Sequence, residues 1–168
     1  MSYVLGITCY GSHDAAVALI ENGNVIAAVE EERFSRKKLD NSFPKNSIDY
    51  CLKYAGIGAN DLDAIAFFWD PRLYFAKRLK YFFRYLPNTV NLIRFGDNQG
   101  RLLNIERELR KRYNYKGKFC FVEHHLAHAA SAFMLSPFEK ASIVSIDGIG
   151  EFDTTWCGVG EGRMIRLI

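Results

Sequence analysis

Residues 3–30 read YVLGITCYGSHDAAVALIENGNVIAAVE, and this stretch determines the fold expected for the chain. It contains three short apolar segments, at 3–8, 15–20 and 25–30. The turn Glu21-Asn-Gly-Asn24 joins the second segment to the third, and Asn-Gly adopts the positive φ angles of a tight hairpin at little cost. The stretch therefore predicts three consecutive antiparallel strands at the N-terminus.

Beyond residue 30, helical and strand patterns alternate along the chain. A helix is expected between Pro44, which can open one, and Gly56, because apolar residues between them recur at helical spacing. Further strands are predicted at 62–69, 119–122 and 141–146, with a hairpin over 152–168 that turns at Glu161-Gly162. Further helices are predicted at 72–86, about 99–113 and 124–136. The alternation predicts an α/β fold with a mixed sheet, N-terminal antiparallel hairpins and flanking helices.

Size and composition are those of an ordinary soluble protein. The 168 residues can bury a core, and 49% of them are hydrophobic and 24% charged. The longest apolar run, 64–69, is far shorter than the roughly 20 residues of a membrane span, and no secretory signal opens the chain. The four cysteines are widely spaced and form no Cys-x-x-Cys motif, which fits reduced thiols. We therefore expect a cytoplasmic protein without a membrane span.

The net charge of +3 conceals a basic block. Residues 71–116 contain 12 Lys/Arg and 3 Asp/Glu, a net charge of +9, while the remainder has a net charge of −6. Within the block, 72–86 predicts an amphipathic helix with a basic face. Such a block can bind nucleic acid, anionic lipid or phosphorylated substrates, and it can equally be a solvated helix face. The Arg and Tyr residues over 107–115 would suit nucleic acid, but no recognised nucleic-acid motif accompanies them.

Three residues form a candidate metal site. His124 and His128 are four positions apart, so on a helix their imidazoles project from one face, close enough to hold a single ion. A metalloprotease of the His-Glu-x-x-His type is not indicated, because His125 stands where the Glu is required. Asp147 ends a strand that we expect to be buried, where a carboxylate is costly unless it is paired or bound to metal. The alternatives are a partly exposed polar helix face and a common Asp-Gly turn.

Two glycine-containing turns are candidate phosphate sites. In Gly11-Ser-His-Asp14, the turn N–H groups and Ser12 could hold a phosphate, while His13 could polarise a carbonyl or move a proton. Gly148 and Gly150 follow Asp147, and their bare backbone would let a ligand or phosphate approach closely. A simple hairpin loop is the alternative for the first turn.

Taken together, these segments resemble the N-terminal domain of the nodulation-protein type carbamoyltransferases. The matching blocks occur in the family's order: Leu5-Gly-Ile, His13-Asp-Ala-Ala16, Ala28-Val-Glu-Glu-Glu-Arg-Phe-Ser-Arg-Lys-Lys38, Glu123-His-His-Leu-Ala-His-Ala-Ala-Ser-Ala-Phe133, Ser136-Pro-Phe138 and Asp147-Gly-Ile-Gly-Glu151. The resemblance implies an actin-like ATPase, ribonuclease H-like domain related to the tRNA threonylcarbamoyltransferases. Residues 1–168 would be the N-terminal half of that domain, incomplete at the C-terminus, with a basic helical insert at about 71–116.

The resemblance also implies an activity. Carbamoyl phosphate and ATP would give carbamoyl adenylate, and the carbamoyl group would pass to a hydroxyl of a small-molecule or saccharide acceptor. A divalent metal would be held by His124, His128 and Asp147 and by a further aspartate absent here; iron is expected, and zinc or manganese also suit these donors. His13 and Asp14 match the family's pair near the carbamoyl group.

One departure concerns ATP. The wider actin-like superfamily carries an aspartate in its first strand that faces the nucleotide's metal, whereas this chain has Leu5-Gly6-Ile7 there. The expectation of ATP use therefore rests on the resemblance alone.

The resemblance further implies that much of the enzyme is missing, because family members are several times longer. We expect the isolated chain to have no turnover and to need a partner chain, or a homo-oligomer, to complete its site. The alternative is a non-catalytic or split-enzyme module that binds a chain carrying the missing domains.

Overall fold

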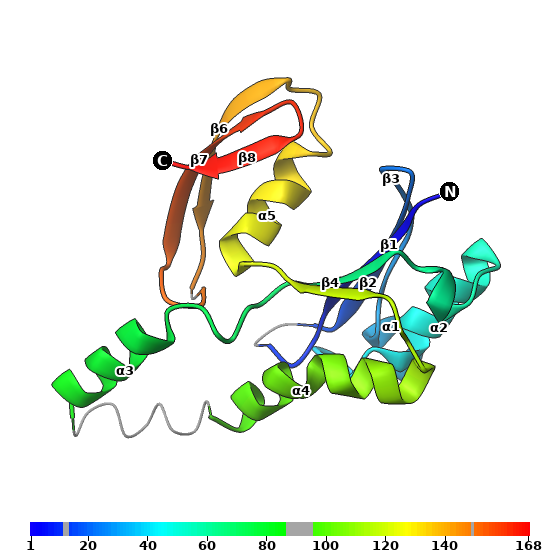
Figure 1. The fold of residues 1–168 in the computed structure, drawn as a ribbon, viewed down its shortest axis with the longest axis horizontal. Coiled ribbons are helices and arrows are strands. Elements are labelled where there is room, and N and C mark those ends of the chain that lie inside the picture. Colours follow the sequence, from blue (N-terminus) through cyan, green and yellow to red (C-terminus); the bar gives the residue numbers. More distant parts are fainter. Residues whose placement is uncertain (12–13, 87–95, 149) are drawn as a thin grey trace. The chain divides into compact units, whose positions relative to one another are not determined.

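The computed structural model describes residues 1–11, 14–86, 96–148 and 150–168 (Figure 1). The chain forms two compact units. Unit 1 comprises residues 1–68 and 87–121, and unit 2 comprises residues 69–86 and 122–168.

Unit 1 is built on a five-stranded mixed sheet. Its strands are β1 (Tyr3–Thr8), β2 (Ala16–Glu21), β3 (Asn24–Glu30), β4 (Ala64–Phe67) and β5 (Lys118–Phe121). They lie in the order β3-β2-β1-β4-β5 (Figure 1). β1, β2 and β3 pair antiparallel, while β4 pairs parallel with β1 and β5 parallel with β4. This is the arrangement of a ribonuclease H-like sheet, so the predicted α/β class and the N-terminal hairpins are confirmed.

Local sequence explains the tight β2–β3 turn. Asn22 and Gly23 have φ angles of 49° and 89°, in the left-handed region that a two-residue hairpin loop requires. On its other edge β2 pairs with β1 in a register that places Leu19 opposite Leu5, and both side chains are fully buried. Register matters here because a shift of one residue would turn these side chains to the other face.

Two helices supply the rest of the unit 1 core. α2 (Lys45–Ala55) follows Pro44 and ends at Gly56, whose φ of 67° suits a left-handed cap. It buries Ile48, Cys51 and Leu52. α4 (Gly96–Tyr113) buries Leu102, Ile105 and Leu109, which are spaced at three and four residues.

Some boundaries in unit 1 differ from the predictions. β4 is shorter than 62–69, and α4 begins at Gly96 rather than near 99. The structure also adds the short helices α1 (Glu32–Ser35) and η1 (Ala59–Asp61). Glu31 illustrates why short-range sequence patterns do not predict every helix boundary and cap. Its buried carboxylate accepts hydrogen bonds from the backbone N–H groups of Asn46 and Ser47, and so caps α2 from 15 residues away.

Unit 2 contains a three-stranded antiparallel sheet and the helix α5 (His124–Phe133). The strands β6 (Lys140–Ile146), β7 (Thr155–Glu161) and β8 (Met164–Leu167) lie in the order β6-β7-β8. α5 ends at Phe133, three residues before the predicted end, and the Phe133 ring packs so closely on Gly160 that a Cβ there would lie 2.6 Å from it. The helix α3 (Phe75–Arg84) also belongs to this unit.

The expectation that β6 is a buried strand is wrong. Ser145 on β6 is buried, but Val144 is 62% exposed and Ile146 is 78% exposed. The physical reason is that α5 covers one face of the sheet, and no described element covers the other. The position of Asp147 therefore depends on its own contacts and not on burial of the strand that precedes it.

Candidate metal centre

His124, His128 and Asp147 converge in unit 2. His124 and His128 lie one turn apart on α5, and Asp147 directly follows β6. The Nε2 atoms of His124 and His128 lie 2.7 Å and 3.2 Å from Oδ2 of Asp147, and 3.1 Å from each other. Among the described residues, these three side chains form a group whose ligand atoms all lie within 4.8 Å of one another, which is close enough to share a metal ion.

The distances between these atoms fit a common ion. Ligand atoms about 2.0–2.2 Å from one metal, at angles of roughly 90–110°, lie about 2.8–3.6 Å from one another. The separations of 3.1 Å and 3.2 Å fall in that range, and the 2.7 Å contact needs only a small adjustment. Two imidazoles and one carboxylate are suitable donors for iron, zinc or manganese. The residues present therefore fit a divalent metal.

The electrostatics also favour a cation. Burial lowers the pKa of His124, and the hydrogen bond from His124 lowers the pKa of the Asp147 carboxyl to about 2. At neutral pH these shifts favour a neutral His124 and an ionised Asp147, which are the states that bind metals. The His124 side chain is 7% exposed, whereas that of His128 is 52% exposed, so the centre is open on the His128 side.

We expect the metal-free protein to lose stability as the pH falls. His124 has a lowered pKa in the folded state, so its stabilising effect is complete above about pH 6.5 and declines below it. Asp147 adds to this loss of stability as the pH falls from 3.8, the ordinary pKa of its carboxyl group, to about 2, its pKa in the folded protein. Urea unfolding at several pH values checks this expectation, with Asp147→Asn flattening the acidic slope. Equal slopes for the two proteins below about pH 4 would contradict it.

Two buried residues that sequence reasoning gave no role hold this centre in place. The Glu151 carboxylate accepts hydrogen bonds from the backbone N–H groups of His124 and Asp70, so it caps the start of α5. His125 is 2% exposed; its Nδ1 lies 2.8 Å from Ser145 Oγ, and its Nε2 lies 2.9 Å from the Asp153 carbonyl oxygen. The motif Asp147-Gly-Ile-Gly-Glu151 contains Glu151, but no local pattern links it to a helix 27 residues earlier.

The other predicted residues of unit 2 differ in what they contact. Gly148 is exposed, and nothing in the described structure lies within 4 Å of the position a Cβ would take. Gly150 is buried, and a Cβ there would lie 2.8 Å from the His125 ring. Open space for a phosphate therefore exists at Gly148, whereas the bare backbone of Gly150 accommodates His125.

The predicted turn of unit 1 is described in part. Ser12 and His13 lie outside the described residues. The carbonyl oxygen of Gly11 accepts a hydrogen bond from Asn41. Asp14 has a buried Oδ1 atom with no hydrogen-bond partner among the residues that the structure describes. A buried carboxylate oxygen without a hydrogen-bond partner is energetically costly unless a ligand donates to it. This is consistent with a ligand-binding site at this turn.

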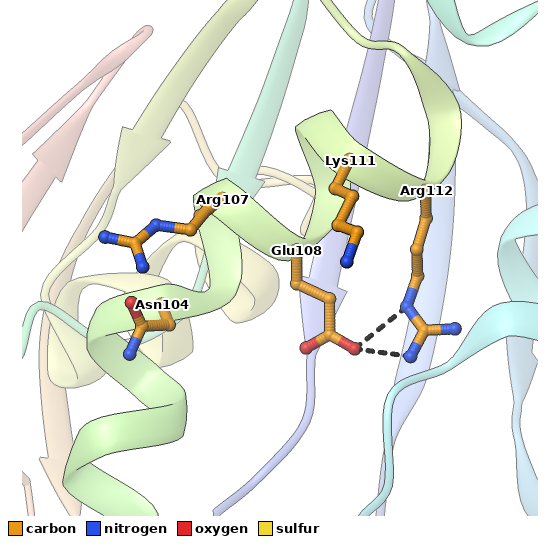
Figure 2. A pocket seen from close by; sticks show the side chains of 5 residues that line it. All are labelled: Asn104, Arg107, Glu108, Lys111 and Arg112. Atoms are coloured by element: carbon orange, nitrogen blue, oxygen red, sulfur yellow. Dashed lines mark hydrogen bonds and ion pairs between the residues drawn. The ribbon is translucent and has the colours of Figure 1, made fainter.

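The basic face of α4 is largely occupied by contacts within the chain. Figure 2 shows a pocket of about 560 Å³ on this helix, lined by Asn104, Arg107, Glu108, Lys111 and Arg112. Arg112 forms an ion pair of 2.7 Å with Glu108, which also accepts a hydrogen bond from the Tyr10 hydroxyl. Arg110 is likewise paired, with Glu106. These pairs favour a solvated, structural helix face over a nucleic-acid site.

The fold and the site together define an α/β protein with a ribonuclease H-like sheet in unit 1 and a candidate metal centre of two histidines and an aspartate in unit 2. Residues 3–167 match the model of the protein family described as "Carbamoyltransferase N-terminus". The chain therefore belongs to this carbamoyltransferase family, as the resemblance of its motifs implied.

Several known proteins are similar to this chain. "Uncharacterized protein sll1178" of Synechocystis is 37% identical over 175 residues, which cover 98% of the chain and 28% of that protein. "Nodulation protein NolNO" of Sinorhizobium fredii is 36% identical, over 92% of the chain and 22% of that protein. Among solved structures, YeaZ from Pseudomonas aeruginosa aligns with 100% of the chain and 65% of its own length, at 18% identity and a TM-score of 0.49. The chain thus spans about a quarter of the length of these curated relatives.

Proposed function

We propose that this chain provides the first part of a carbamoyltransferase. Carbamoyl phosphate would be hydrolysed to carbamate and inorganic phosphate, and the carbamate oxygen would displace pyrophosphate from ATP to give carbamoyl adenylate. A hydroxyl of a small-molecule or saccharide acceptor would then take the carbamoyl group, with AMP as the leaving group. The observation that carries the proposal is the convergence of His124, His128 and Asp147 in a chain that matches the family over residues 3–167. Because the chain spans about a quarter of its curated relatives, the activity belongs to the longer protein.

The residues of unit 2 would hold a divalent metal, with iron expected and zinc or manganese also suited to the donors. When bound, the metal would act as a Lewis acid that polarises the carbamoyl carbonyl. His124 and His128 contribute lone pairs without charge, and Asp147 contributes one negative charge. With these three ligands a divalent metal would keep one positive charge, and the further aspartate expected from the longer protein would neutralise it. Since the His128 side chain is half exposed, substrate would approach from that side.

The turn of unit 1 would bind the carbamoyl group and a phosphate. Three hydrogen bonds tie it to the segment at 40–41: Tyr10 N–H to the Asn41 carbonyl, Ala15 N–H to the Asp40 carbonyl, and the Asn41 side chain to the Gly11 carbonyl. In this proposal, Gly11 and Ser12 hold the phosphate, and His13 and Asp14 orient the carbamoyl group and move a proton. Of the second candidate pair, Gly148 and Gly150, only Gly148 has open space beside it for a phosphate, because the His125 ring lies against Gly150.

A reconstitution experiment tests this proposal. The chain alone should give no carbamoyl transfer, and it should gain activity when mixed with a polypeptide that continues the sequence of a longer relative. The readouts are pyrophosphate release from ATP and carbamoylation of the acceptor. His124→Ala should lower the reconstituted rate by more than about 100-fold, because a ligand of the polarising metal is lost. Turnover by the chain alone, or equal rates for the wild type and His124→Ala, would refute the proposal.

The second candidate function is a non-catalytic or split-enzyme module that binds a partner chain. A specific observation favours it: the apolar side chains of Val144, Ile146 and Met164 lie on one face of the unit 2 sheet and are 62–78% exposed. β6 pairs with β7 and with no other described strand, whereas β1 in unit 1 pairs with both β2 and β4. An open strand edge beside an apolar face suits a further strand and helix. A stable complex without turnover in the mixture above would favour this function.

A further inference from the structure

α3 is a two-sided helix whose apolar side is uncovered. The side chains of Phe75, Leu79, Phe83 and Leu86, the last just beyond the helix end, are 45–64% exposed. With 3.6 residues per turn, these four positions fall on one side. No residue of α3 is buried. A cluster of two phenylalanines and two leucines in water is unfavourable, so this stripe indicates an interaction surface.

The opposite side of α3 faces unit 2. The Tyr81 ring packs against the Phe152 ring with 5.4 Å between centroids, and the Lys77 ammonium lies 5.5 Å from the centre of the same ring. Lys77 and Tyr81 are one turn apart, roughly 180° around the helix from the apolar stripe. Contacts of Lys77 and Tyr81 with Phe152 thus hold this side of α3 against unit 2, and the exposed Phe75, Leu79 and Phe83 lie on the other side of the helix.

Charge identifies what the stripe would meet. Residues 71–86 contain five Lys or Arg and no Asp or Glu. Four of the five, Arg72, Lys77, Lys80 and Arg84, are exposed, and Arg78 is half-buried. An apolar partner groove would need no such excess of positive charge, whereas a surface of anionic lipids attracts it. Aromatic and leucine side chains on one side and lysine and arginine on the other are the composition of helices that lie in a membrane interface.

We propose that α3 docks the chain on an anionic lipid surface. Phe75, Leu79 and Phe83 would enter the headgroup region, while Lys80 and Arg84 would reach lipid phosphates with their flexible ends. The helix would lie on the bilayer, since no helix in the described ranges is long and apolar enough to cross one. This inference does not depend on the metal centre or on carbamoyl transfer.

Vesicle co-sedimentation with the whole chain tests the proposal. Phosphatidylcholine vesicles containing phosphatidylglycerol should bind the protein, and pure phosphatidylcholine vesicles should bind it much less. The double variant Leu79→Glu, Phe83→Glu should weaken binding more than about tenfold, because two inserted apolar groups are lost. The variant Lys80→Gln, Arg84→Gln should lower binding severalfold and reduce its sensitivity to salt. Leu103→Glu is the matched control, since Leu103 is a 55% exposed leucine on α4.

Two results would overturn the inference. The first is equal binding of the wild type and the Leu79→Glu, Phe83→Glu variant, or no preference for phosphatidylglycerol. The second is self-association of the wild type without vesicle binding, lost in the same variant, which would assign the stripe to a second copy of the chain. Circular dichroism of each variant serves as the folding check. Unfolding is not expected, because neither Leu79 nor Phe83 is buried.

Discussion

Replacement of both His124 and His128 by alanine is expected to abolish divalent-metal binding. The double variant removes two of the three ligand atoms that lie within 4.8 Å of one another, and leaves Asp147 alone. Loss of a residue that only supports a metal ligand typically costs 10–100-fold in affinity, so loss of two ligands should exceed about 100-fold. Calorimetric titration with Fe²⁺, Zn²⁺ and Mn²⁺, followed by elemental analysis of the purified protein, gives the measurement.

His13→Ala is the matched control for that experiment. It also removes one imidazole from a chain with four histidines, and the family resemblance does not assign His13 to the metal. Its metal content should equal that of the wild type. Equal metal content in the wild type and in the His124→Ala, His128→Ala variant would remove the metal centre from the account of this protein.

Short-range patterns made part of the fold predictable. The β2–β3 hairpin follows from Asn22-Gly23, because the two residues that must adopt positive φ are neighbours in the sequence. The same is true of α2, with Pro44 at its start and Gly56 at its end. His124 and His128 were found for the same reason, since a spacing of four residues on a helix fixes which face they share.

Asp147 was selected for a reason that the structure does not support. The prediction for Asp147 requires a buried strand before it, yet the neighbouring Ile146 is 78% exposed. The carboxylate owes its position to the His124 Nε2 atom 2.7 Å away, a contact across 23 residues. Which residue of a loop meets which helix depends on how the chain packs at long range, and periodicity in the sequence carries no information about that. The position of Asp147 within the family's ordered sequence blocks is the stronger reason to predict it as a metal ligand.

The buried glutamates were unpredictable on the same grounds. Glu31 and Glu151 stand in acidic or glycine-rich stretches that read as solvent-exposed, yet their side chains are buried and cap α2 and α5. Each satisfies helix N–H groups that have no partner within their own helix. Only a structure shows which distant helix needs an acceptor.

Glu151→Ala is expected to damage both the stability of the protein and its metal site. The change leaves the backbone N–H groups of His124 and Asp70 without their acceptor. Each unsatisfied donor costs about 1–3 kcal/mol, so we expect the two to lower the free energy of unfolding by roughly 2–6 kcal/mol. Metal affinity should fall about 10–100-fold, because the end of α5 that carries His124 is no longer fixed. Urea unfolding and metal titration of the folded variant measure the two effects.

Two further variants separate these effects. Burial raises the pKa of Glu151, so a neutral side chain of the same shape is tolerable there, and Glu151→Gln should retain most of the metal affinity. Glu31→Ala removes an equally buried cap, that of α2, where Glu31 binds Asn46 and Ser47. It should lower stability by a similar amount, with metal affinity unchanged. A parallel loss of affinity in Glu31→Ala would mean that Glu151 acts only through overall stability, and not by positioning His124.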